Sequence, residues 1–121
     1  MVDKDKEKIG NIIKERNYTH NYFLKNSKVY RAFVDLEQKT YSDGHLKKKY
    51  KELIALGISI IINCESCIQW HINEALNSGS TKEEIIETIE VGIEMGGGPA
   101  TVASRFALKV LDYYNKENSL E

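Results

Sequence analysis

The sequence predicts an all-α protein, a single-domain helical bundle of five or six helices. The 121-residue chain contains one proline, which leaves room for long uninterrupted helices. Apolar residues recur three and four positions apart, and no run shows a convincing apolar/polar alternation. The Asp43-Gly44 pair lies between two helical patterns rather than two strands, and therefore indicates a turn.

The first half of the chain contains three helical patterns. The first covers about residues 3–16, and the second covers about 27–40 after Ser27, a suitable N-cap. The third begins after Ser42-Asp43 and runs to about Ile62. Its lysine-rich first turns are expected to form a solvated face rather than a phosphate- or partner-binding patch. Its last turns are apolar on nearly every side, which predicts a central helix or one covered by another subunit.

The second half of the chain contains three more helical patterns. A helix from about Cys64 to Asn77 is closed by Gly79. Two overlapping Ser/Thr-x-x-Glu capping boxes at residues 80–84 open the next helix. The Gly-Gly-Gly-Pro run at residues 96–99 predicts a helix break rather than a phosphate loop, because it lacks the lysine and hydroxyl of a Walker loop. The last helix, about residues 99–115, has a stripe that is expected to be buried: Val102, Ala103, Phe106, Ala107, Val110, Leu111 and Tyr114.

Charge and hydropathy exclude two classes of function. The 17 basic and 18 acidic residues give a net charge of -1, which argues against a nucleic-acid partner. The longest nearly apolar stretch, Leu53 to Ile62, is about half the length that a membrane span needs. The charged N-terminus has no apolar signal segment, so we expect no membrane association and a cytoplasmic location. Cysteines there are normally reduced, and a static structural disulfide is not expected.

Both cysteines and one histidine share a helical stripe. Cys64, Cys67 and His71 stand at positions i, i+3 and i+7. Two cysteines at this spacing fall within the Cα separation that a disulfide tolerates, so they could cycle between dithiol and disulfide. They also open their helix, where unpaired N–H groups favour a thiolate.

Glu52 joins this group only if the chain folds back. In one continuous helix it would lie about 18 Å from Cys64. If the chain reverses near Asn63, Glu52 and His71 lie on antiparallel helices and could meet. A carboxylate on an imidazole fixes its tautomer and raises its basicity.

Spacing alone leaves three interpretations open: a redox pair, a zinc site formed by the same four residues, and inert cysteines. A thioredoxin fold is excluded because its motif follows a strand. His20 and His45 are expected to lie outside any site. Trp70 is expected to pack at a helix or subunit contact.

The segment resembles the AhpD-like alkylhydroperoxidase branch of the carboxymuconolactone decarboxylase family. That signature is a glutamate, eleven residues, Cys-x-x-Cys, three residues and a histidine, and Glu52, Cys64, Cys67 and His71 match it in full. The flanking residues 51–56, 79–84 and 96–100 agree. The resemblance covers about residues 30–112, so residues 1–121 form one AhpD-like domain with a helical extension at residues 1–26.

The resemblance implies a cytosolic thiol peroxidase that assembles as trimers or hexamers and needs no cofactor or metal. Cys67 would attack a hydroperoxide, and Cys64 would then close a disulfide that a dithiol or thioredoxin-like donor reduces. Glu52 and His71 would relay the proton. Better-studied members carry a second histidine between the cysteines where this chain has Ser66, so the relay would be one base short. The alternatives are a decarboxylase-like lyase and a non-catalytic zinc-binding oligomer.

Overall fold

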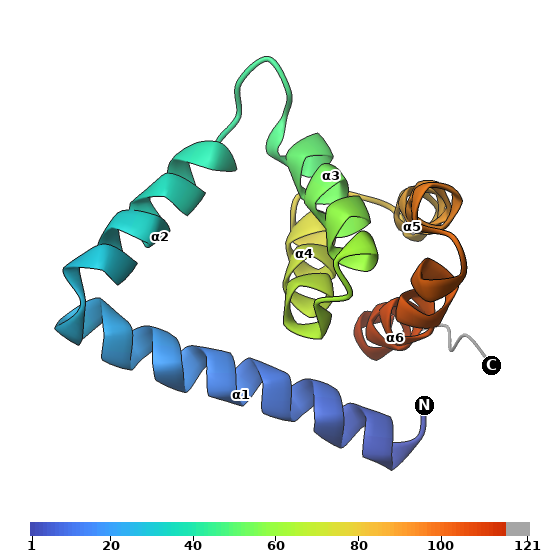
Figure 1. Cartoon of the computed structure of the whole chain (residues 1–121), viewed down its shortest axis with the longest axis horizontal. Helices are drawn as coiled ribbons and strands as arrows, with labels where there is room; N and C mark the ends of the chain where they lie inside the picture. The colour runs from blue at the N-terminus through green and yellow to red at the C-terminus, as the bar shows by residue number, and fades with distance from the viewer. Residues whose placement is uncertain (116–121) are drawn as a thin grey trace.

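The structure, a computed structural model that describes residues 1–115, contains six α-helices and no strand in that part of the chain (Figure 1). The prediction of an all-α fold is confirmed. The helices are α1 (Asp3–Asn26), α2 (Lys28–Thr40), α3 (Lys48–Ile61), α4 (Glu65–Asn77), α5 (Lys82–Gly96) and α6 (Gly98–Tyr114).

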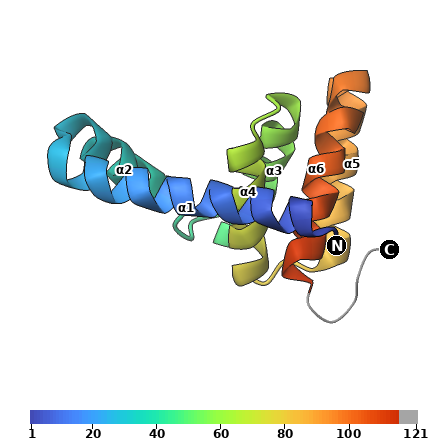
Figure 2. The ribbon, with the colours of Figure 1, turned by 90° about the horizontal axis from the view of Figure 1, so that it is seen from below.

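Helices α3 to α6 form a bundle, and α3 lies at its centre against α4 and α5. Leu56 and Ile60 of α3 are fully buried among side chains of α4, α5 and α6. Helix α1 begins against α6, where Ile9 is buried, and then crosses α4 and runs away from the bundle (Figure 2). Helix α2 returns from its far end, so α1 and α2 form an arm with few fully buried side chains.

Two helix boundaries differ from the sequence prediction. Helix α1 continues ten residues past residue 16, because residues 17–26 contain no proline or glycine. The side chain of Ser27 caps α2 as predicted. Helix α3 begins at Lys48 rather than directly after Asp43. The Asp43 carboxylate reaches forward to accept a hydrogen bond from the Lys48 backbone N–H at 2.7 Å, and the residues between them form a loop.

One of the two predicted capping boxes forms. Thr81 and Glu84 exchange side-chain and backbone hydrogen bonds at the start of α5. Ser80 is buried instead and caps nothing. The predicted stripe of α6 is also wrong at Val102, which is 52% exposed, because it lies one position off the line through Ala103 and Phe106.

The lysines of the third pattern are not simply a solvated face. Lys49 pairs with Glu84 of α5 at 2.8 Å, and Lys48 pairs with carboxylates of α3 and α4.

Among the described residues, no helix is long and apolar enough to cross a membrane.

The break between α5 and α6 depends on one glycine of the run. Gly97 alone separates the two helices and has a positive φ of 71°. Gly97→Ala should lower the free energy of unfolding by about 1–2 kcal/mol, because a Cβ disfavours this backbone conformation. Gly10→Ala is the matched control within α1, where an added Cβ meets nothing within 4 Å. It should stabilise the protein by about 0.5–1 kcal/mol. Urea denaturation measures the free energy of unfolding of both variants. Equal changes in the two variants would contradict the role of Gly97 in the break.

Candidate active site

A tight turn between α3 and α4 brings their polar residues together. Helix α3 ends at Ile61, and Asn63 adopts a left-handed φ of 52°, which non-glycine residues tolerate best as asparagine or aspartate. Cys64 then caps α4, with its sulfur accepting the backbone N–H of Cys67. The predicted reversal near Asn63 is confirmed, and the two helices lie against each other (Figure 1).

The reversal places Glu52 of α3 against His71 of α4. Glu52 Oε1 lies 2.7 Å from His71 Nδ1, and the carboxylate is only 1% exposed. Its second oxygen, Oε2, accepts a hydrogen bond of 2.9 Å from Lys48 Nζ, one turn earlier on α3. The same ammonium group lies 3.0 Å from Glu74 of α4. Lys48 therefore bridges two carboxylates, one buried and one near the surface.

These contacts decide the charge of Glu52. Burial by itself would raise the pKa of the carboxyl group. The hydrogen bonds from His71 and Lys48, together with the charge of Lys48, outweigh burial and lower the Glu52 pKa below its ordinary value. Glu52 is therefore ionised at neutral pH and accepts the Nδ1 proton of His71. This leaves Nε2 as the ring nitrogen that Glu52 does not engage.

The cysteines lie at the N-terminal end of α4. Cys64 and Cys67 form a disulfide across Cα atoms 5.2 Å apart, so the predicted compatibility of their spacing with a bond is confirmed. Cys67 lies in the first turn, where backbone N–H groups and the helix dipole favour a negative charge. Once the pair is reduced, this position stabilises a Cys67 thiolate.

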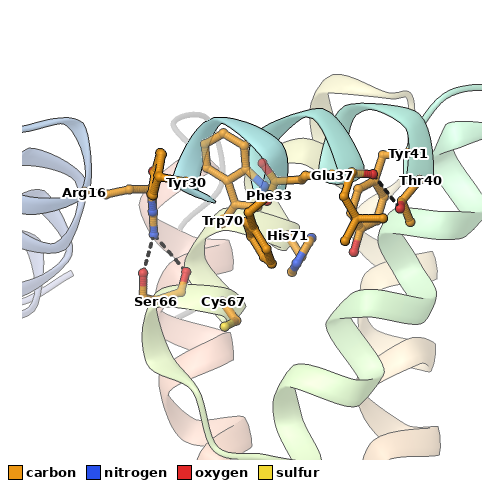
Figure 3. A pocket seen from close by; sticks show the side chains of 11 residues that line it. Arg16, Tyr30, Phe33, Glu37, Thr40, Tyr41, Ser66, Cys67, Trp70 and His71 are labelled. Carbon is orange, nitrogen blue, oxygen red and sulfur yellow. Dashed lines mark hydrogen bonds between the residues drawn. The ribbon is translucent and has the colours of Figure 1, made fainter. Parts of the chain in front are cut away.

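A pocket of about 440 Å³ opens over this end of α4 (Figure 3). Cys67, Trp70 and His71 form its floor, and side chains of α2 face them from the other side. The α2 residues that line it are Tyr30, Phe33, Leu36, Glu37 and Thr40, followed by Tyr41. The lining is largely apolar, with the sulfur and the imidazole exposed to the same space. Trp70 therefore lines the site, contrary to the sequence expectation.

The structure brings together the four residues that the sequence singled out, and sequence reasoning missed two neighbours. Lys48 stands four positions before Glu52, so i,i+4 pairing could have indicated it. Arg16 reaches the pocket from α1, a contact that no local spacing predicts. Within residues 1–115, no three His, Cys, Asp or Glu side chains are arranged to hold a metal ion.

The model of the carboxymuconolactone decarboxylase family matches residues 27–110. The chain belongs to this family. The chain is also similar to an uncharacterised protein of Cupriavidus necator, 34% identical over 88 residues, covering 73% of this chain and 75% of the relative. An uncharacterised protein from the cox locus of Paracoccus denitrificans is 40% identical over 81 residues, covering 67% and 73%.

Two solved structures show the same fold. A carboxymuconolactone decarboxylase family protein from Legionella pneumophila superposes with a TM-score of 0.79 at 31% identity, covering 90% of this chain and 96% of that one. A family member from Thermotoga maritima superposes with a TM-score of 0.77 at 26% identity, covering 84% and 86%. An involvement in an antioxidative response has been suggested for the Thermotoga protein.

Lys48 should control the acid stability of this family member. The pKa of Glu52 is lower in the folded state than in the unfolded state. Its ionised carboxylate therefore stabilises the fold at pH values above the ordinary glutamate pKa, and this stabilisation is lost as the pH falls through the lowered pKa of the folded state. Lys48→Met removes one cause of the lowering and should move the loss to higher pH by about one unit. Urea denaturation across a pH series measures the shift. Lys51→Met is the matched control, since Lys51 Nζ only donates to the Ser42 carbonyl. Equal shifts in both variants would refute this role.

Proposed function

We propose that the protein is a thiol-dependent peroxidase that reduces organic hydroperoxides through Cys67 and Cys64. The observation that carries the proposal is the position of Cys67. It lines the same pocket as His71, and His71 is held from behind by the buried, ionised Glu52. A cysteine at a helix N-terminus, next to a base that is itself oriented by a carboxylate, is the usual arrangement of an activated nucleophile. The largely apolar lining favours an organic hydroperoxide over hydrogen peroxide.

The reaction would run in three balanced steps. The Cys67 thiol gives its proton to His71, and the thiolate attacks the terminal oxygen of the hydroperoxide. The O–O bond breaks, Cys67 becomes a sulfenic acid, and the departing alkoxide takes the proton from His71 to leave as an alcohol. The Cys64 thiol then attacks the Cys67 sulfur, and the disulfide forms with the release of water. A dithiol or thioredoxin-like donor finally reduces this disulfide and becomes oxidised itself.

The disulfide seen between the two cysteines is the expected resting product of this cycle. It would be regenerated at each turnover rather than serve as a permanent crosslink, which fits a reducing, cytosolic location. No cofactor or metal enters any step.

The two cysteines should behave differently when each is replaced. Cys67→Ser should abolish the oxidation of a dithiol by cumene hydroperoxide. Cys64→Ser should still react once and accumulate a sulfenic acid on Cys67, because only the resolving thiol is lost. Thiol counting, intact mass and trapping of the sulfenic acid distinguish these outcomes. His71→Asn should slow the first step by about a hundredfold, the size of a general-base contribution. Full turnover by Cys67→Ser would refute the proposal.

A decarboxylase-like lyase is the second candidate, because the Glu52–His71 pair faces an apolar pocket without needing the cysteines. It predicts conversion of a lactone acid by the Cys64→Ser/Cys67→Ser double variant. Loss of that activity in the double variant, or its absence in the wild type, would exclude the lyase.

A non-catalytic zinc protein is distinguished by metal analysis of the reduced chain. One zinc per chain would support the zinc-binding alternative.

We also propose that the chain forms a homo-oligomer, with a trimer or hexamer expected. An apolar groove of about 530 Å³ runs between α3 and α5, and Ile54, Ile58 and Met95 on it are at least half exposed. Apolar surface of this extent on a small domain is typical of an interface. Ile58→Glu should reduce the oligomer in light scattering, whereas Glu90→Lys, an exposed substitution elsewhere on α5, should not. A monomeric wild type at micromolar concentration would contradict the assembly.

A further inference from the structure

Helix α1 lies entirely outside the part of the chain that matches the family model, yet it contacts the first turns of α4. The contact is made chiefly by Arg16. One terminal nitrogen of its guanidinium donates to the Ser66 carbonyl at 2.8 Å and to the Ser66 hydroxyl at 2.9 Å. The other donates to the Gln69 side-chain carbonyl. The guanidinium also lies 5.2 Å from the centre of the Trp70 ring.

These contacts tie Arg16 into the interior of the protein. Gln69 is 1% exposed and donates in turn to the Tyr114 hydroxyl of α6. Arg16 thereby links α1 to α4 directly, and to α6 through Gln69. The planar guanidinium group of an arginine, with its forked N–H donors, loses little conformational freedom for each hydrogen bond that it makes. It is therefore suited to holding a fixed geometry.

Arg16 brings a positive charge to the pocket that Cys67 also lines. Ser66, which accepts two of its hydrogen bonds, directly precedes Cys67, and both cysteine and arginine line the pocket (Figure 3). Among the described residues that line it, Arg16 is the only one with a permanent positive charge. We propose that Arg16 is a positioning residue of the dithiol: it holds the first turn of α4 in place and favours the thiolate of reduced Cys67.

The other charged groups around Cys67 either carry a negative charge or have a weaker effect on a thiolate than Arg16. His71 of α4 acts as the base, and behind it the charges of Glu52 and Lys48 on α3 oppose each other. Glu37 of α2 is a negative group in the pocket and disfavours a thiolate. Burial raises the pKa of the Tyr41 and Tyr114 hydroxyls, so both are neutral at pH 7.

A second cation of α1 is weaker at this site. Lys8 pairs with Glu65, the first residue of α4, at 2.9 Å, and its side chain is 52% exposed. The opposing charge and the solvent screen it. Burial lowers the pKa of Arg16, but its guanidinium remains charged at neutral pH. Arg16 is therefore the cation of α1 with the larger effect on Cys67.

The Cys67 thiol can be titrated without any peroxide. In a Cys64→Ser background, Cys67 is the only cysteine of the chain, and the pH dependence of its alkylation by iodoacetamide reports its pKa. Arg16→Gln should raise the midpoint by about one pH unit, the lower end of the effect of a nearby opposite charge. Alkylation at pH 7 should slow only about threefold, because the less acidic thiolate is also more nucleophilic.

Three further variants separate charge from structure. Arg16→Lys, which keeps the charge but not the fork, should restore part of the shift. Ser66→Ala removes one anchor of the guanidinium and should raise the midpoint by a smaller amount. Lys8→Gln removes the Lys8–Glu65 ion pair between α1 and α4 and should leave the midpoint within about 0.2 units. Circular dichroism checks that each variant is folded, and 1 M salt should reduce the difference between Arg16→Gln and its parent.

The proposal is overturned if neither Arg16→Gln nor Ser66→Ala moves the midpoint, or if Lys8→Gln moves it as much as Arg16→Gln. Should Arg16→Gln fail to fold, Ser66→Ala decides alone. The contribution of Arg16 to turnover rests on the proposed peroxidase function, but its charge acts on the thiol whether or not a hydroperoxide is present. A protein that does not react with peroxides but shows the expected shift of the alkylation midpoint would refute the peroxidase proposal. It would still support the positioning role of Arg16.

Discussion

The buried carboxylate of Glu52 is the group on which the site depends. An ionised carboxylate with 1% exposure is costly unless it is paired and hydrogen-bonded, and both of its oxygens are. His71 satisfies one oxygen from α4, and Lys48 satisfies the other from α3. The requirement to pair this charge fixes how α4 lies against α3, the central helix of the bundle. The same contact orients the imidazole, so the packing of the fold and the chemistry of the site share one interaction.

The cysteine pair lies at the N-terminal end of α4, where the first backbone N–H groups have no carbonyl partner within the helix. Cys64 closes the turn as the N-cap, and Cys67 occupies the first turn with the positive end of the helix behind it. The two residues that face each other at spacing i, i+3 therefore have different surroundings. Cys67 faces the pocket, and Cys64 supports it from the turn. This asymmetry supports separate roles for the two sulfurs as attacking and resolving thiols.

The other half of the site comes from the arm formed by α1 and α2. It supplies the apolar wall opposite Cys67 and the arginine that holds the start of α4. The arm buries little of its own surface, because α2 has no fully buried residue. The Glu52–His71 pair and the two cysteines are thus held by a well-packed bundle, whereas the opposite wall of the pocket is held by a few polar and aromatic contacts. A wall of this kind can change in shape and polarity without disturbing the Glu52–His71 pair.

Much of the fold and the four central site residues could be predicted from the sequence. Helical periodicity, the Ser27 and Thr81 caps and Gly79 are local signals, because each acts within one or two turns of a helix. The spacing of Cys64, Cys67 and His71 is likewise set by helix geometry. The start of α3 differs from the prediction, because the Asp43 carboxylate accepts the Lys48 backbone N–H across a loop whose length no local pattern reveals.

The order of the residues along the chain is enough to show which side chains are able to do chemistry and which of them share a helix face. The packing of the helices against one another sets the surroundings of those side chains. Whether Glu52 is ionised depends on Lys48 and His71, one of which lies on another helix. Whether Trp70 lines a pocket depends on where α2 crosses, and Arg16 reaches Ser66 across fifty positions of the chain. Electrostatic and packing energies depend on distance in space, and in a bundle of helices neighbours in space are set by how whole helices cross.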